Sequence, residues 1–250
     1  MNTGTGLTDV GRRRDHNEDA FLIDDRRGLY VVADGVGGHA KGEVASAEAV
    51  EQIQNWVIRH DPLVQEYLND PSEEAFYALR RMVESGIQSA CYLIHSMAQQ
   101  EPDRKGMSTT MSMALVIDTL VLIGQVGDSR VYLMREGKAT QITEDHTLIN
   151  YKLKHGLLTP EQAKKAPGKN VITRAVGHLD YVEVDVTDLI AQAGDRLILC
   201  SDGLHGYLLD GEIDVYGSKS PEESCKGLVD LANSRGGRDN ITVMVVDVRF

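Results

Sequence analysis

The stretch Leu29-Tyr-Val-Val-Ala-Asp34-Gly35 is a short apolar run that ends in an acidic residue and a glycine. A second stretch, Arg196-Leu-Ile-Leu-Cys-Ser-Asp202-Gly203, has the same form, and the apolar run 120–126 is followed by Gly127-Asp128. Apolar runs of this length, rich in branched residues, indicate buried strands. A carboxylate at the end of a buried strand is held rigidly, and the neighbouring glycine lets another group approach the backbone closely. These stretches therefore predict a buried sheet whose strand ends carry fixed acidic groups.

Four acidic residues stand at the ends of predicted strands: Asp34, Asp128, Asp202 and Asp239. Where such strand ends converge, the carboxylates repel one another unless a cation neutralises them. Magnesium and manganese prefer carboxylates, backbone carbonyls and water as ligands. We therefore expect a metal site of oxygen ligands, to which Gly35 adds a carbonyl and the nearby pair Glu18 and Asp19 adds two carboxylates. The alternative is that these acidic residues only form turns, but four of them, two in matching settings, favour the metal.

The composition suits one large domain, with 250 residues of which 42% are hydrophobic and 26% charged. A net charge of -12 argues against nucleic acid and anionic membrane surfaces as partners. The three cysteines form no CxxC pair, which suits core positions in a reducing compartment. No apolar run approaches transmembrane length, and the polar N-terminus does not resemble a signal peptide. We therefore expect a cytoplasmic location, and we also expect a monomer.

Hydrophobic periodicity predicts strands in runs, interrupted by a few helices. Strands are expected at residues 20–24, 29–33, 109–117, 120–126, 130–134, 139–142, 182–186, 196–200 and 241–248. Helices are expected at residues 43–60, 73–100 and 221–233, the last with Ser220 as its cap and Pro221 in its first position. This order is typical of α+β proteins. It predicts two antiparallel sheets packed together, with the long helices on their outer faces.

Other site chemistries leave no matching pattern. No Cys-x5-Arg loop and no GxxxxGK[ST] loop is present, and no two histidines have the HxxxH spacing of a zinc site. His39, beside the predicted centre, is a general acid, a hydrogen-bond donor to substrate or only a loop residue, and His16 and His146 carry the same alternatives. Arg14 precedes the acidic pair and is suited to clamp a phosphate, whereas the neighbouring arginines 12 and 13 are interpreted as a solvated turn.

These residues fall within an ordered series of motifs: Gly11-Arg-Arg-Arg14-Asp-His-Asn17-Glu18-Asp19-Ala20, Val32-Ala-Asp34-Gly35-Val-Gly37-Gly38-His39, Ser108-Thr-Thr110, Val126-Gly-Asp128-Ser-Arg130, Glu144-Asp-His-Thr147, Cys200-Ser-Asp202-Gly203 and Gly237-Arg-Asp239-Asn240-Ile-Thr242. With this order the chain resembles the PP2C (PPM) family of metal-dependent Ser/Thr protein phosphatases, specifically its compact bacterial form. The resemblance covers residues 5–248. It implies a single domain over residues 1–250, with an antiparallel β-sandwich flanked by helices in four layers, α-β-β-α, and a flap subdomain at about residues 143–175.

The resemblance also implies two core ions, Mn²⁺ or Mg²⁺. Asp34 would bridge them, Gly35 would give its carbonyl to one, and Asp202 and Asp239 would hold the other.

Further roles surround this core. Glu18 and Asp19 would act through metal-bound water, Arg14 would bind the substrate phosphate, and His39 would contact the substrate. Asp128, together with Asp202, resembles the position of a third ion in bacterial members of the family. No departure from the family pattern, such as His205 in place of the usual Thr, removes an expected ligand.

The implied activity is hydrolysis of phosphoserine and phosphothreonine by direct attack of a metal-bridging water, without a phosphoenzyme. Asp34, Asp202, Asp239 and Arg14 are the expected catalytic residues. The expected partners are phosphorylated proteins, either the substrates of a Ser/Thr kinase or the kinase itself, so the enzyme would counter kinase signalling. A catalytically silent binding module and a phosphatase of small phosphoesters are the alternatives, and retention of the metal carboxylates argues against the first.

The polar segment 143–174 breaks the strand pattern, with one short helical piece after Thr159-Pro-Glu161. A connection of this length in a compact domain is usually functional. It is rich in lysine, at positions 152, 154, 164, 165 and 169. We expect it to influence the choice of protein substrate, and the alternative is a surface insertion without a role.

Overall fold

The computed structural model describes residues 2–37, 41–163, 166–168 and 171–250, and its strands form two sheets. One sheet has the order β1 (Thr3–Asp9), β11 (Ile241–Asp247), β10 (Arg196–Cys200), β7 (Arg130–Arg135) and β8 (Lys138–Gln141). The other has the order β2 (Asp19–Asp24), β3 (Leu29–Val36), β5 (Met111–Ile117), β6 (Leu120–Val126) and β9 (Asp185–Ile190), with β4 (Ser108–Thr109) paired to the end of β3. Neighbouring strands in both sheets run antiparallel.

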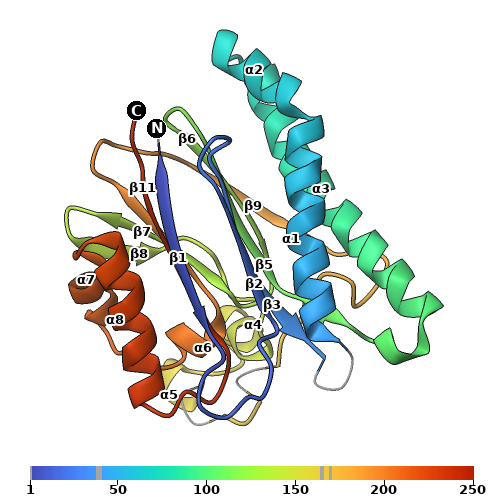
Figure 1. Ribbon diagram of the computed structural model, residues 1–250, viewed down its shortest axis with the longest axis vertical. Helices are drawn as coiled ribbons and strands as arrows, with labels where there is room; N and C mark the ends of the chain where they lie inside the picture. Colours follow the sequence, from blue (N-terminus) through green and yellow to red (C-terminus); the bar gives the residue numbers. More distant parts are fainter. Residues whose placement is uncertain (1, 38–40, 164–165, 169–170) are drawn as a thin grey trace.

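Helices cover the outer face of each sheet, as Figure 1 shows. On the side of β3 lie α1 (Gly42–Arg59), α2 (Asp61–Asn69) and α3 (Glu73–Gln100), followed by the short 3-10 helix η1 (Pro102–Arg104). On the side of β11 lie α6 (Asp202–His205), α7 (Glu212–Gly217) and α8 (Pro221–Ser234), while α4 (Leu148–Lys154) and α5 (Pro160–Ala163) lie at one end of the sandwich. The predicted α+β class and four-layer sandwich are confirmed. Within the described part of the chain, no helix combines the length and the apolar character that a membrane crossing would need.

Three hydrophobic cores separate the four layers, because successive residues of a strand point to opposite faces of its sheet. Leu29 and Val31 of β3 pack against α1 and α3, whereas Tyr30 and Val32 pack between the two sheets. On the other sheet, Ile198 faces the helical layer that contains α8. Both faces of each central strand are therefore buried, which explains why their sequences are continuous apolar runs. The three cysteines are free and buried, as expected of core residues.

The structure corrects the predicted elements at several places. The strand expected at 182–186 is only partly right: the ladder with β6 begins at Asp185, and residues 182–184 belong to no strand. Their alternation reflects packing of Val182 and Val184 against the helical core, which does not require a ladder. The run 109–117 is interrupted at Thr110, whose N–H donates to the carbonyl of Asp34.

The sequence patterns did not reveal β1, α2, α4, α6 or α7. In β1 the reason is visible, because Gly4 and Gly6 make room for aromatic rings of the neighbouring sheet. A Cβ atom would lie 2.8 Å from Tyr30 at Gly4 and 2.7 Å from Phe21 at Gly6. Small residues at these positions leave the strand without an apolar run.

Candidate metal centre

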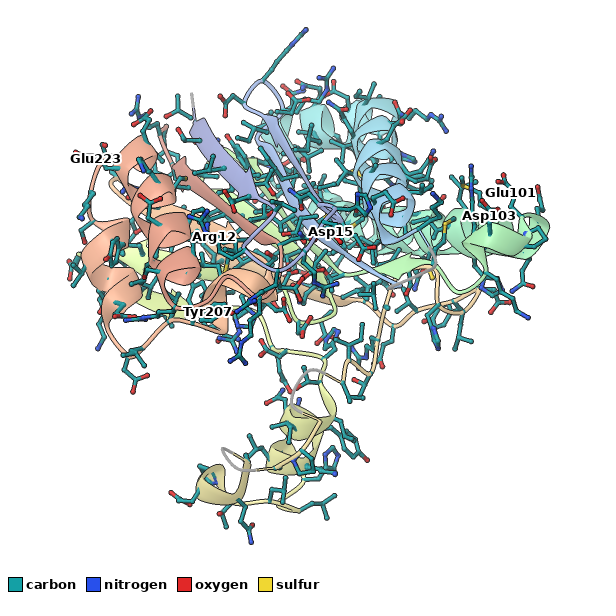
Figure 2. The ribbon with its side chains drawn as sticks, turned by 60° about the horizontal axis from the view of Figure 1, so that its bottom comes forward. Arg12, Asp15, Glu101, Asp103, Tyr207 and Glu223 are labelled. Carbon is teal, nitrogen blue, oxygen red and sulfur yellow. The ribbon has the colours of Figure 1, made fainter. Side chains whose placement is uncertain are left out.

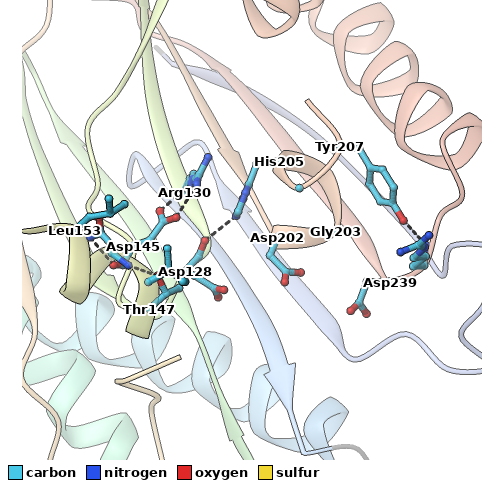
Figure 3. A pocket seen from close by; sticks show the side chains of 14 residues that line it. Asp128, Arg130, Asp145, Thr147, Leu153, Asp202, Gly203, His205, Tyr207 and Asp239 are labelled. Carbon is cyan, nitrogen blue, oxygen red and sulfur yellow. Dashed lines mark hydrogen bonds and ion pairs between the residues drawn. The ribbon is translucent and has the colours of Figure 1, made fainter. Parts of the chain in front are cut away.

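The strand-end carboxylates meet at one end of the sandwich. Asp19 and Asp34 are directly opposite each other in the β2–β3 ladder, and Asp202 follows β10 where Asp239 precedes β11. Figure 3 shows Asp202 between Asp128 and Asp239. A cavity of about 300 Å³ is lined by the predicted site residues Arg14, Glu18, Asp34, Gly35, Asp128, Asp202 and Asp239. Of the remaining two, Asp19 is buried next to Asp34, and His39 lies outside the described residues.

Burial and mutual repulsion raise the pKa values of these carboxyl groups. The pKa of Asp34 lies well above its ordinary value, mainly because of burial and then because of the charges of Asp19 and Asp202. Burial, followed by the charge of Asp202, raises the pKa of Asp128 to about 7. Asp34 and Asp202 line the same cavity, and the charge of Asp202 contributes to the raised pKa of Asp34. Clustered carboxylates of this kind require a proton or a cation among them.

Asp19 connects the two sheets at the centre. Its Oδ2 accepts hydrogen bonds from the hydroxyls of Ser201 (2.8 Å), which directly follows β10, and Thr242 (2.6 Å) of β11, both on the side of the opposite sheet. Its Oδ1 is buried without a hydrogen-bond partner in the described structure, and burial raises its pKa to about 6. An orphaned carboxylate oxygen is suited to accept from water in a cation's coordination shell. Sequence reasoning assigned no role to Ser201 or Thr242, although both stand in the quoted motifs.

The glycines beside the acidic residues allow the close backbone approach that the sequence predicted. A Cβ atom at Gly203 would lie 1.9 Å from the carbonyl oxygen of Asn240. At Gly35 it would lie 2.4 Å from the carbonyl oxygen of Gly42 and 2.6 Å from that of Glu18. Any larger residue at these two positions would push the neighbouring chain segments, and the carboxylates they carry, away from the centre.

The side chain of Asn240 holds the loop that carries Arg14 through hydrogen bonds to its backbone. Its Oδ1 accepts from the N–H of Glu18 (2.8 Å), and its Nδ2 donates to the carbonyls of Val10 (3.0 Å) and His16 (2.9 Å). The side chain is buried, so these bonds replace the ones it would make with water. Asn240 is therefore a positioning residue that the sequence motif contained but whose role only the folded chain reveals.

The structure pairs Arg14 with Asp239. The Arg14 Nη2 atom donates to Asp239 Oδ2 at 2.8 Å, and the two side chains are 43% and 35% exposed. This hydrogen bond raises the pKa of Arg14, so the guanidinium stays charged. An ion pair this exposed contributes only ~1 kcal/mol, so a cation at Asp239 and an anion at Arg14 can readily replace it.

The residues present fit hard divalent cations. Within the described ranges, no three Asp, Glu, His or Cys side chains are grouped to enclose one ion. Mg²⁺ and similar ions keep several waters and need only one or two carboxylates each, so such a group is not required. The fit rests on three observations: Asp34 and Asp202 line one cavity, one oxygen of Asp19 is buried without a partner, and the carboxylates of the lining offer only oxygen atoms.

The flap segment, residues 143–175, projects beside the centre, and Figure 2 shows α4 and α5 standing out from the body. His146 lies at its base, where it is buried and its Nδ1 accepts from the N–H of Gly127 (3.1 Å). Of the alternatives for His146, these contacts favour structural support. Of the five lysines, those at 164, 165 and 169 lie outside the described residues, and Lys154 pairs with Glu144.

In metal-free protein, Asp128→Asn is expected to raise the melting temperature at about pH 8 by on the order of 5 °C. The folded-state pKa of Asp128 is raised to about 7 from 3.8. The protonated form of Asp128 therefore stabilises the folded protein. This stabilisation is complete below about pH 4 and is lost as the pH rises through 7. Thermal melts at about pH 5 and pH 8 in EDTA check this. At pH 5 the difference should be less than about half as large as at pH 8, and an equal shift at both values would contradict the assignment.

Known proteins are similar to this chain over nearly its whole length. Residues 10–237 match the family model described as Protein phosphatase 2C. Protein phosphatase PhpP of Streptococcus pneumoniae is 36% identical over 97% of this chain and 96% of its own length. Serine/threonine phosphatase stp of Listeria welshimeri is 39% identical, with coverage of 96% and 93%.

Solved structures show the same fold. The Mycobacterium tuberculosis serine/threonine phosphatase PstP/Ppp superposes with a TM-score of 0.85 at 34% identity, covering 100% of this chain and 99% of that one. A PstP catalytic domain in complex with two manganese ions gives a TM-score of 0.83 at 33% identity, with coverage of 100% and 99%.

Proposed function

Because the chain belongs to the protein phosphatase 2C family and is a Ser/Thr protein phosphatase, we propose that its strand-end carboxylates form the centre where phosphoserine and phosphothreonine are hydrolysed. The observation that carries the assignment is that Asp34, Asp202 and Asp239 line one cavity together with Arg14. The family and the manganese-bound PstP structure support dependence on a divalent cation.

Each residue has a distinct part in the proposed reaction. Asp34, Asp202, Asp239 and the carbonyl of Gly35 would hold two cations, Mn²⁺ or Mg²⁺. When bound, the cations supply a water of lowered pKa and neutralise charge on the phosphate. Asp128 and Asp202, which line the same cavity, would hold a third ion.

Arg14 orients the substrate in this proposal. Its guanidinium is charged and exposed at the cavity, where paired N–H groups suit phosphate oxygens. Glu18 and Asp19 accept hydrogen bonds from water molecules at the centre. These bonds keep the water on the attacking side of the phosphate in a fixed position. The leaving Ser or Thr oxygen takes its proton from water or from His39. No covalent enzyme intermediate is required, so the phosphate passes directly to water.

The proposal extends to the cellular setting. The substrates are phosphorylated proteins, and we place the enzyme in the cytoplasm as a monomer that reverses Ser/Thr kinase action. The net charge of -12 opposes nucleic acid as a partner. The test is phosphate release from a phosphothreonine peptide with added manganese. Steady hydrolysis is expected, and binding of the peptide without hydrolysis would instead indicate a silent phosphoprotein-binding module.

Arg14→Ala is expected to raise the KM for a phosphothreonine peptide about tenfold or more, with a smaller change in kcat. The guanidinium binds the phosphate in both the ground state and the transition state, so its loss appears mainly as weaker binding. Steady-state kinetics at saturating manganese give the two constants. Arg13→Ala is the matched control, because Arg13 is exposed on the same loop and lines neither cavity of the centre. An unchanged KM in Arg14→Ala would move phosphate binding elsewhere.

A further inference from the structure

A larger cavity of about 540 Å³ opens from the metal centre toward the flap segment (Figure 3). It shares Asp128, Asp202 and Asp239 with the smaller cavity, so the two are continuous. The proposed chemistry occupies only the end at these carboxylates. The rest of the volume is therefore available to residues that neighbour the phosphorylated one in the same peptide.

The two walls of this larger cavity come from separate parts of the chain. On one side, Ile149 and Leu153 of α4 are four residues apart and so lie on the same face of the helix. On the other side, Tyr207 follows α6, and Figure 3 shows Leu153 and Tyr207 at opposite ends of the view, with Asp202 between them. Each of these apolar side chains is only partly buried. An extended peptide can therefore pass between α4 and Tyr207.

The cavity contains two arginines with different surroundings. Arg130 is fully engaged: it donates to Asp145 through two nitrogens, at 2.8 and 2.6 Å, and to the hydroxyl of Tyr132 at 3.0 Å. Arg238 is exposed, and only its backbone N–H is engaged, with the hydroxyl of Tyr207 at 2.8 Å. Its guanidinium makes no hydrogen bond or ion pair with any part of the chain that the structure describes. Arg238 therefore supplies an uncompensated positive charge beside the centre.

We propose that Arg238 determines specificity by binding the carboxylate of an Asp or Glu close to the phosphorylated Ser or Thr of the substrate. The inference rests on the proposed function, since the phosphate must first lie at the carboxylate centre. A guanidinium is suited to carboxylates because it donates two parallel N–H groups. The chain as a whole is strongly acidic and repels acidic peptides. A free cation next to Asp239 offsets that repulsion at the point where the peptide enters.

The test uses two phosphothreonine peptides that differ only in Asp or Asn residues on both sides of the phosphothreonine. The quantity measured is the ratio of kcat/KM for the acidic peptide to that for the amide peptide. In the unaltered protein we expect a ratio of about three to five, the range for one partly exposed ion pair. Arg238→Gln should bring the ratio to about one, Arg238→Lys should keep part of it, and Arg238→Glu should invert it. Added salt should lower the ratio of the unaltered protein, because exposed pairs are screened.

Arg13→Ala is the control for charge, since it removes one exposed cation that lines neither cavity. Its ratio should equal that of the unaltered protein. An unchanged ratio in Arg238→Gln, or an equal fall in Arg13→Ala, would overturn the inference while leaving the proposed function intact. Failure of the unaltered protein to hydrolyse either peptide would overturn both.

Discussion

Asp34→Asn is expected to lower kcat for a phosphothreonine peptide by roughly two to three orders of magnitude, with the protein still folded. Asp34 is opposite Asp19 in the β2–β3 ladder and lines the same cavity as Asp202. The amide keeps the shape of the side chain but removes a charge that both core cations would share. The backbone around it should persist, because the N–H of Asp34 donates to Thr110 and its carbonyl accepts from Thr110 N–H.

Asp103→Asn is the matched control for this substitution, since Asp103 is exposed on η1, lines neither cavity of the centre and lies at one edge of the molecule, away from Tyr207, in Figure 2. Turnover at saturating manganese and a far-ultraviolet circular dichroism spectrum are measured for both variants. The control should match the parent in both respects. Near-normal turnover in Asp34→Asn would show that the centre lies elsewhere.

Removal of divalent cations is expected to abolish activity entirely and reversibly. The cavity offers carboxylates, a carbonyl and one guanidinium, and none of the described residues lining it is a cysteine or histidine. Without a cation, the clustered carboxylates repel the substrate phosphate, and no metal lowers the pKa of the attacking water. Activity after dialysis against EDTA, and again after addition of manganese or magnesium, checks the expectation. Full turnover in exhaustively chelated protein would exclude a metal mechanism.

The centre was predictable where its signal is local in the sequence. Asp34 and Gly35 follow an apolar run, and Asp202 and Gly203 repeat the pattern, so a rigid carboxylate beside a close backbone approach follows from neighbouring residues alone. The same runs predicted the two sheets, because a strand that is buried on both faces must be apolar throughout. The order of the motifs then gave the family resemblance, which implied the roles of the individual residues.

The remaining features depend on contacts between distant segments. Ser201 and Thr242 contact Asp19 only because the two sheets pack face to face. The spacing of these residues in the sequence does not predict that contact. Gly4 and Gly6 made β1 unrecognisable, since aromatic rings of the other sheet fill the space above them. The charge of Arg238 likewise became informative only when its neighbours in space were known.

The most direct test of the central claim is a count of bound manganese by isothermal titration calorimetry, comparing metal-free parent protein with Asp34→Asn. The account predicts that the parent binds at least two ions per chain, as in the manganese-bound PstP structure, and that Asp34→Asn loses at least one of them. A parent protein that binds no manganese, or a variant that binds the same number of ions with the same affinity, would contradict it.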